Sequence, residues 1–290
     1  MTPPPLLALL RPHQWVKNTF VAAPLFFTPA AISAATVQAT ALGILAFCLL
    51  SSAVYVLNDF LDRKADRQHP TKRHRPLAAG TVPLALAGGV AVVFFAGGLA
   101  LSLSLGTGFA IAAAAYLINN ALYSVWLKHV AIIDVMSITL GFVLRVEAGG
   151  FATSVELSAW IVIMTGLLAV FLGLAKRRDD IVKKLGNNHR RSLDGYSRRF
   201  LDAALAMIVG ALLVAYLIYT TDQQVMNRLG TDKLFYTAPF VAYGLLRYMQ
   251  ITMVHERSGS PTKIALTDWP IIAAVIGWVS TFGLLIYDAA

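Results

Sequence analysis

The stretch TALGILAFCLLSSAVYVLNDFLDRKAD, residues 40–66, passes from almost pure hydrocarbon into a dense group of charges. Its apolar part is long enough to cross the hydrocarbon core of a bilayer as a helix. Similar apolar windows recur along all 290 residues, of which 57% are hydrophobic and only 13% charged. A soluble domain carries about 25% charged residues. The sequence therefore predicts an all-α polytopic membrane protein.

We expect nine transmembrane helices, punctuated at most turns by Pro, Gly or Ser. They lie at about 18–35, 38–57, 82–104, 107–127, 130–149, 157–175, 200–220, 234–253 and 270–288. They form a single membrane domain over residues 1–290, with two charged cytosolic loops at about 58–81 and 176–199. The loops follow the second and sixth spans, and this spacing indicates a duplicated helical unit with matching loops over one shared cavity.

The distribution of positive charge predicts the orientation in a bacterial-type inner (plasma) membrane. All 24 Lys and Arg residues except Arg145, Arg228 and Lys233 fall on the side of the N-terminus. By the positive-inside rule the N-terminus and both charged loops are cytosolic, and the C-terminus lies on the far side. The formal net charge of +9 comes from cations in short loops, and this placement suits binding to membrane lipid head groups or phosphorylated substrates rather than to nucleic acid.

The chain has a single cysteine, Cys48, which excludes a disulfide within one chain.

The acidic end of the second span is a candidate metal site. On a helix Asp59, Asp62 and Asp66 share one face at i, i+3 and i+7, and Asn58 lies one turn before Asp62. Carboxylates held so close repel one another unless a cation sits among them. Hard oxygen ligands suit Mg²⁺ shared with substrate phosphates, so we assign these four residues as metal ligands and the three carboxylates as catalytic. The alternative is a solvated loop in which Asp and Arg merely pair.

Positively charged residues follow the acids directly. Lys72, Arg73 and Arg75 are predicted to contact phosphate groups. The N-terminal segment carries Arg11 and Lys17 and is expected to lie at the membrane interface, with Lys17 as a further substrate-binding candidate.

The segment NNALYSVWLKHVAIIDV, residues 119–135, supplies further candidates. Asn120, Ser124 and Lys128 share one helix face at i, i+4 and i+8. Tyr123 is adjacent and Asp134 begins the next span. We predict catalytic roles for Lys128 and Asp134 and a substrate-binding role for Tyr123; the alternative is that such side chains only cap or snorkel.

Arg145 is an intramembrane cation. It lies about 16 Å deeper than Asp134 on the same helix face, at 1.5 Å per residue. A charge at that depth must be paired or face a wet cavity. We predict that Arg145 binds substrate, and the alternative is a structural partner of Glu147 or an Asp.

The second charged loop reads LAKRRDDIVKKLGNNHRRSLDGYSRRF, residues 174–200. Lys176 and Asp180 are one helical turn apart and continue an apolar span without a break. The substrate-binding candidates here are Lys176, Arg177, Asp180, His189, Arg190 and Tyr196. The alternative is an ordinary positive-inside loop.

Several of these strings resemble one family. NDFLDRKAD, residues 58–66, is similar to the NDxxDxxxD signature of the UbiA superfamily of intramembrane prenyltransferases, and YSVWLKHVAIID, residues 123–134, to its Tyr/Lys segment. RPHQWVKN, ADRQHPTKRHRPLAAG, GFVLRVEAGG and HRRSLDGYS resemble the decaprenyl-phosphate phosphoribosyltransferase branch. The resemblance implies nine helices in a UbiA-like bundle around a central cavity that opens to the cytosolic side.

The resemblance also implies an activity. It is the Mg²⁺-dependent (or Mn²⁺-dependent) transfer of 5-phosphoribose from phosphoribosyl diphosphate (PRPP) to a polyprenyl, decaprenyl-type phosphate, with release of diphosphate, as a step in cell wall biosynthesis. Where the superfamily usually has a second DxxxD, this chain reads KRRDD, residues 176–180. The departure argues against a prenyl diphosphate donor, and its three cations would balance the larger negative charge of a ribosyl donor and a lipid phosphate.

Two rival functions remain open from the sequence. One is a UbiA-type prenyltransferase that moves a polyprenyl chain from its diphosphate to an aromatic or other acceptor. The other is a transporter for a phosphorylated metabolite, although the polar residues gather at one membrane face instead of the midplane. The glycine-rich span AGGVAVVFFAGGLA, residues 87–100, is a surface on which a homo-oligomer could pack.

Overall fold

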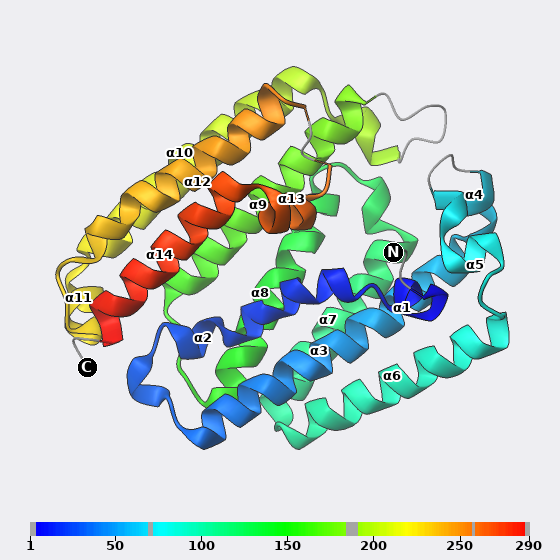
Figure 1. Cartoon of the computed structure of the whole chain (residues 1–290), viewed down its shortest axis with the longest axis horizontal. Helices are drawn as coiled ribbons and strands as arrows, with labels where there is room; N and C mark the ends of the chain where they lie inside the picture. The colour runs from blue at the N-terminus through cyan, green and yellow to red at the C-terminus, as the bar shows by residue number, and fades with distance from the viewer. Residues whose placement is uncertain (1–3, 69–71, 184–190, 257–258, 288–290) are drawn as a thin grey trace. The chain divides into compact units, whose positions relative to one another are not determined.

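The computed structural model describes residues 4–68, 72–183, 191–256 and 259–287 (Figure 1). Every regular element within these ranges is helical, so the predicted all-α class is confirmed for the described part of the chain. Seven of the helices are long and apolar enough to cross a membrane. The prediction of a multi-pass membrane protein is confirmed in this form.

The seven long helices coincide with seven of the nine expected spans. They are α3 (Ala34–Leu61), α6 (Leu84–Ser104), α7 (Thr107–Val125), α8 (Ile133–Thr153), α9 (Ala159–Val182), α10 (Arg198–Thr221) and α14 (Trp269–Tyr287). The other two expected spans lie on shorter elements. The first is divided among η1 (Pro12–Ala22), α2 (Ala23–Phe26) and η2 (Pro29–Ala31), and the eighth between η6 (Leu234–Thr237) and α12 (Ala238–Met253). The count of nine therefore stays a prediction.

Short helices occupy much of both charged segments that the sequence suggested as loops. Between α3 and α6 lie α4 (Arg63–Gln68), η3 (Lys72–His74) and α5 (Pro76–Ala79), and α9 itself continues to Val182. The remaining elements are α1 (Pro5–Leu10), η4 (Leu127–His129), η5 (Arg191–Gly195), α11 (Gln223–Leu229) and α13 (Pro261–Thr267). Functional side chains in these segments are therefore held largely on regular backbone.

The backbone divides into two compact units. Unit 1 comprises residues 1–26, 31–125 and 144–156, and unit 2 comprises residues 27–30, 126–143 and 157–290. Helix α8 contributes its first half to unit 2 and its second half to unit 1. The expectation of one membrane domain stays a prediction.

Unit 1 is built on the packing of α3 against α6, which run side by side in Figure 1. Gly98 makes the approach close, because a Cβ atom there would lie 2.8 Å from Leu50 Cγ. The ring of Phe47 on α3 meets Phe109 and Tyr116 edge to face. These aromatic contacts form the center of a buried apolar cluster that fixes α3 in the unit.

Helix η1 is an unusually long 3₁₀ helix of 11 residues. With three residues per turn, Trp15, Asn18 and Val21 fall on one face. Trp15 and Asn18 donate hydrogen bonds to serines of α3, and the Val21 carbonyl lies directly over Gly149 of α8. These contacts with α3 and α8 explain why the segment keeps the tighter pitch.

Unit 2 packs α9 against α10 and α12 against α14. Its apolar core includes Phe171, Leu201, Leu205 and Tyr248. Gly173 of α9 lies against Val135 of α8, 2.7 Å from where a Cβ atom would stand. This close approach sets the start of α8 beside the end of α9, where the second group of predicted site residues lies.

Candidate active site

In unit 1 the acidic end of α3 is a buried cluster of ion pairs. Arg75 Nη1 lies 3.1 Å from Asp59 Oδ1 and 2.8 Å from Asp66 Oδ2, so one guanidinium joins both carboxylates. Arg11 Nη2 contacts the same Asp59 oxygen at 2.5 Å. The side chains of Asp59 and Asp66 are only 2% and 4% exposed. The structure thus brings together two of the three predicted carboxylates and one of the predicted phosphate-binding arginines.

Asp62 has a different setting from its neighbours. Helix α3 ends at Leu61, and Asp62 is its C-terminal cap, with its N–H donating to the Asn58 carbonyl. Its side chain is half-buried. The backbone stays close to helical across this junction, because the N–H of Asp66 donates to the Asp62 carbonyl at 2.8 Å.

The acidic cluster is suited to a divalent ion that is shared with a substrate. Within the described ranges no three His, Cys, Asp or Glu side chains converge as a metal-binding group. Mg²⁺ in phosphate-handling sites commonly takes only one or two carboxylates and completes its shell with phosphate oxygens and water. Asp59 and Asp66 meet that requirement, because their two carboxylates are held close enough together for Arg75 to contact both. The donor set fits a divalent ion, and the ligand assignment stays a proposal.

Asn58 connects the acidic cluster to α7. Ser124 donates to Asn58 Oδ1 at 2.7 Å and to the Asn120 carbonyl at 2.8 Å. Asn120 in turn donates to the Tyr116 carbonyl. Helix α7 ends at Val125, however, and Lys128 lies on the separate turn η4 in unit 2. The predicted helix face therefore holds for Asn120 and Ser124 and is wrong for Lys128.

The remaining predicted residues of unit 1 lie near helix ends. Lys72 and Arg73 are on η3, and Arg73 Nε contacts His74 Nε2 at 3.4 Å. Lys17 is half-buried on η1 and Tyr123 is half-buried on α7. Burial lowers the pKa of His13, as do the charges of Arg11 and Lys17, which keeps this end of η1 from adding a further cation near neutral pH.

Arg145 is buried within unit 1 and has polar and aromatic partners. Its Nε donates to Asn18 Oδ1 at 2.8 Å and its Nη2 to the Tyr116 hydroxyl at 3.0 Å. The guanidinium also lies over the rings of Tyr116 and Phe47, 4.6 Å and 5.7 Å from their centroids. Asn18 links this arginine to α3 by donating to Ser51. Through these contacts Arg145 joins η1, α3, α7 and α8, and its predicted binding of substrate stays a prediction.

In unit 2 a second cluster forms around Asp134. Arg177 Nε lies 2.6 Å from Asp134 Oδ2, and Arg177 Nη1 lies 3.1 Å from Asp180 Oδ2. The Tyr196 hydroxyl donates to Asp134 Oδ1 at 2.7 Å and accepts from the N–H of Ile132 at 2.6 Å. Burial, and then the hydrogen bond to Asp134, raise the pKa of Tyr196, so its phenol stays protonated and donates. Four predicted site residues therefore converge.

The members of this cluster differ in how far their side chains are exposed to solvent. The side chains of Asp134 and Arg177 are 0% and 1% exposed, whereas Asp180 is 18% exposed. Asp134 and Arg177 are thus enclosed in this structure, and Asp180 is the member that reaches the surface. The catalytic role of Asp134 and the substrate-binding role of Arg177 stay predictions.

Arg178 is a buried arginine that the site predictions omitted. Its Nε lies 2.5 Å from Asp202 Oδ1, and its Nη1 donates to the Thr252 carbonyl at 2.6 Å. It therefore fastens α9 to α10 and α12. Of the three cations in KRRDD only Lys176 is partly exposed, and the interpretation that all three balance substrate charge stays a prediction.

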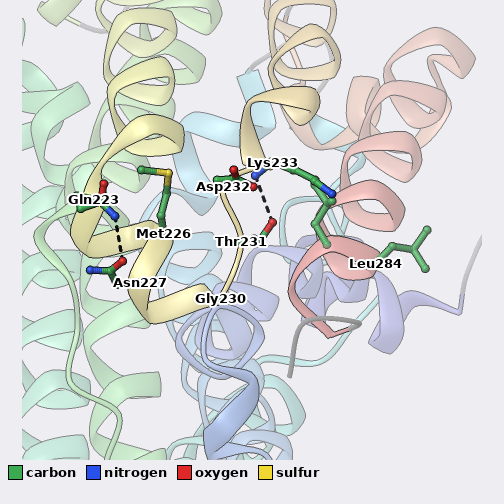
Figure 2. A pocket seen from close by; sticks show the side chains of 9 residues that line it. Gln223, Met226, Asn227, Gly230, Thr231, Asp232, Lys233 and Leu284 are labelled. Carbon is green, nitrogen blue, oxygen red and sulfur yellow. Dashed lines mark hydrogen bonds between the residues drawn. The ribbon is translucent and has the colours of Figure 1, made fainter.

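Two predicted residues, His189 and Arg190, lie outside the described residues. A surface groove of about 900 Å³ in unit 2 contains none of the predicted site residues. Figure 2 shows Gln223, Met226 and Asn227 on one side of it and Leu284 on another.

Arg11 and Asn18 contact predicted site residues in this structure, but neither was predicted from the sequence as a site residue. Arg11 stands before a proline in a segment expected at the interface, and nothing in its spacing points to Asp59. Asn18 lies at the start of an expected span, where a buried amide needs partners. That requirement was a usable signal, since Asn18 proves to be the hydrogen-bond acceptor for Arg145.

Comparison with known proteins shows which family the chain resembles. The UbiA prenyltransferase family matches residues 18–266. A decaprenyl-phosphate phosphoribosyltransferase of Mycolicibacterium smegmatis is 32% identical over 97% of this chain and 92% of its own length. One of Corynebacterium glutamicum is 33% identical over 97% of this chain and 86% of its own. The predicted resemblance to this branch is confirmed.

Solved structures share the fold. A UbiA homologue from Archaeoglobus fulgidus bound to GPP and Mg²⁺ has a TM-score of 0.71 and 20% identity, over 99% of both chains. A UbiA homologue from Aeropyrum pernix in the apo state has a TM-score of 0.59 and 15% identity, over 100% of this chain and 98% of its own. The chain belongs to the UbiA prenyltransferase family.

Proposed function

We propose that this protein transfers 5-phosphoribose from PRPP to a polyprenyl phosphate and releases diphosphate. The observation that carries the proposal is the near full-length similarity to proteins named decaprenyl-phosphate phosphoribosyltransferase. It is supported by the buried acidic cluster with its arginines at the end of α3, where carboxylates and cations suited to a metal-bound diphosphate lie together.

Asp59 and Asp66, with Asp62 and Asn58 beside them, would hold a divalent ion on the diphosphate of the donor. When bound, Mg²⁺ or Mn²⁺ would supply neutralisation of the negative charge that develops on the leaving diphosphate. Arg75, Lys72 and Arg73 would bind phosphate oxygens of the donor.

The reaction is a substitution at the anomeric carbon of ribose. A lipid phosphate oxygen forms the new bond to this carbon, and the bond to diphosphate breaks with its electron pair passing to the diphosphate oxygen. The nucleophile attacks from the opposite face and inverts the configuration. Because the phosphate is already ionised near pH 7, no strong general base is needed, and positioning and charge neutralisation supply the rate enhancement. The acceptor phosphate would be oriented by the cation Lys128 or Lys176.

The direct test supplies purified protein with labelled PRPP, Mg²⁺ and polyprenyl phosphates of several lengths. We expect label in the lipid fraction, an equal amount of diphosphate, and no product after chelation of the metal. The rival prenyltransferase is tested in parallel with polyprenyl diphosphate and aromatic acceptors. A prenylated acceptor without any ribosylated lipid would reject the proposal.

Asp62→Ala separates chemistry from folding. Asp59 and Asp66 are buried in ion pairs, so their loss also disturbs packing, whereas Asp62 is half-buried. We expect Asp62→Ala to reduce transfer by at least about a hundredfold with unchanged elution on size exclusion, because a lost charge on a metal-phosphate site costs several kcal/mol. The control is Asp232→Ala, an exposed carboxylate in unit 2. Wild-type turnover by Asp62→Ala contradicts the assignment.

A further inference from the structure

Arg11 is a cation of the acidic cluster for which the proposed reaction has so far given no role. Its guanidinium contacts Asp59 Oδ1 and lies over the Tyr55 ring, 5.0 Å from the centroid. The ring fixes the plane of the guanidinium beside the carboxylate. Arg11 therefore reaches the cluster from a part of the chain that is 48 residues away from Asp59 in the sequence.

The backbone at Arg11 is in a conformation that a glycine would adopt more easily. Its φ is +54°, in the left-handed region, and Pro12 follows and restricts it further. The position joins α1 to η1, so the chain turns at this residue. This conformation ends α1, where the N–H of Arg11 donates to the Leu7 carbonyl. A glycine would adopt it with less strain, but an arginine at this position supplies a guanidinium to Asp59.

In this structure the negative charges of the acidic cluster are balanced by arginine side chains of the same chain. Two guanidinium groups, from Arg11 and Arg75, meet the two carboxylates of Asp59 and Asp66. Asp59 Oδ1 accepts a hydrogen bond from each of the two arginines. A cation that approached these carboxylates alone would compete with both guanidinium groups.

The arginines have more freedom to move than the carboxylates. The side chains of Arg11 and Arg75 are 23% and 28% exposed, whereas those of Asp59 and Asp66 are nearly inaccessible. Arg11 lies between α1 and η1, whereas Arg75 lies directly before α5, so the two arginines belong to different segments. Each can leave the carboxylates by rotation of its own side chain while the acids stay fixed by α3 and α4.

We propose that Arg11, together with Arg75, is an exchangeable counter-ion that passes from Asp59 to the diphosphate of the donor. This inference rests on the proposed function, since it uses the same metal and diphosphate. Once the carboxylates are neutralised by a divalent ion, the released guanidinium groups face the diphosphate oxygens, which they can bind with paired hydrogen bonds. Arg11 is thus a phosphate-binding residue in the loaded state and a competitor of the metal in the empty state. Metal and diphosphate therefore bind cooperatively, and metal alone binds weakly.

The test measures metal and diphosphate binding separately from transfer. Free Mn²⁺ is followed by electron paramagnetic resonance as it is titrated into wild type, Arg11→Gln and the control Arg67→Gln. Arg67 is an exposed arginine of α4 whose Nε donates to the Ala78 carbonyl, not to a carboxylate. Diphosphate binding is then measured by calorimetry at saturating Mn²⁺.

We expect Arg11→Gln to bind Mn²⁺ alone about tenfold more tightly, because one competing charged hydrogen bond is gone. The same variant should bind diphosphate about tenfold more weakly at saturating Mn²⁺, because one charged contact is lost. Arg67→Gln should match wild type in both titrations. A purely structural Arg11 would change neither affinity in this opposed manner and would only lower the melting temperature.

Other outcomes reject the inference in distinguishable ways. If Arg11→Gln binds Mn²⁺ no more tightly than wild type while wild type binds Mn²⁺ and transfers ribose, the exchange is wrong and the proposed function stands. If wild type binds no Mn²⁺ even with diphosphate, the metal role of the acidic cluster fails as well. Should Arg11→Gln not fold, Arg75→Gln tests the same exchange from the other segment, with the same opposed changes expected.

Discussion

Tyr196 is the residue on which the geometry of the unit 2 cluster most depends. Its hydroxyl accepts from the N–H of Ile132 and donates to Asp134. Ile132 has φ +69°, a conformation that β-branched residues rarely adopt. Such a backbone persists only where surrounding contacts hold it. A single phenol therefore supports both the strained turn before α8 and the carboxylate that pairs with Arg177.

Replacing this hydroxyl should be costly. We expect Tyr196→Phe to lower the free energy of unfolding by about 1–3 kcal/mol, because it leaves a buried carboxylate oxygen and a backbone N–H short of a partner. The control is Tyr248→Phe, a buried tyrosine of the same unit whose hydroxyl has no hydrogen-bond partner among the described residues. That change should be neutral or slightly stabilising. Thermal unfolding in detergent measures both, and equal effects of the two variants would refute this role.

The residue scale also shows what sequence can and cannot predict. Arg145 was identified because a charge deep within an apolar helix must be paired or face a wet cavity, and Asp134 because it begins the next expected span. Which side chain pairs with which was not predictable, since Asn18 and Tyr196 come from distant segments and form their hydrogen bonds to Arg145 and Asp134 only after folding. The sequence also does not reveal which of these side chains are buried. Arg177 was predicted to bind substrate, and in this structure its side chain is enclosed.

At the scale of elements, the close contact of η1 with α8 is what gives Arg145 its partner. A Cβ atom on Gly149 would lie 2.0 Å from the Val21 carbonyl oxygen. This distance leaves room only for glycine, so η1 can lie against α8 along its backbone. Asn18, one 3₁₀ turn before Val21, is thereby placed within hydrogen-bond distance of Arg145.

Gly149→Ala should therefore displace η1. We expect a loss of about 1–3 kcal/mol in unfolding free energy, because the new methyl group meets backbone atoms that cannot rotate away. Gly210→Ala on α10 is the matched control, since nothing lies within 4 Å of a Cβ atom there. The comparison is made by thermal unfolding, with ribosyl transfer as a second readout. Unchanged stability in Gly149→Ala would mean that the contact of η1 with α8 is unimportant.

Hydropathy predicted the position of long, regular α-helices more accurately than that of short or 3₁₀ elements. The seven long helices agree with expected spans because apolar length is the property that a bilayer selects. The first expected span became η1, α2 and η2, since average hydropathy carries no information on helical pitch or on polar contacts such as Trp15 with Ser52. The end of α7 at Val125 was also missed, and with it the separation of Lys128 from Ser124.

At the scale of the whole molecule, the strongest untested expectation is the orientation of the chain in the membrane. Nearly all Lys and Arg residues are on one side of the expected spans. Both charged clusters are built from residues of that side, including Arg75 in unit 1 and Asp180 in unit 2. A water-soluble phosphorylated donor made in the cytosol can reach them only if that side is cytosolic. Orientation and proposed function therefore depend on each other.

Cysteine labelling of intact cells tests this orientation. The native Cys48 is buried, so the wild-type chain gives an unlabelled baseline. Ala65→Cys on α4 and Asp232→Cys in the turn after α11 both place a thiol at an exposed position. We expect a membrane-impermeant maleimide to label Asp232→Cys in intact cells and Ala65→Cys only after permeabilisation, because the positive-inside rule places the acidic cluster in the cytosol. Labelling after denaturation controls for expression. The reverse pattern would place the acidic cluster outside the cell, where a cytosolic ribosyl donor could not reach it.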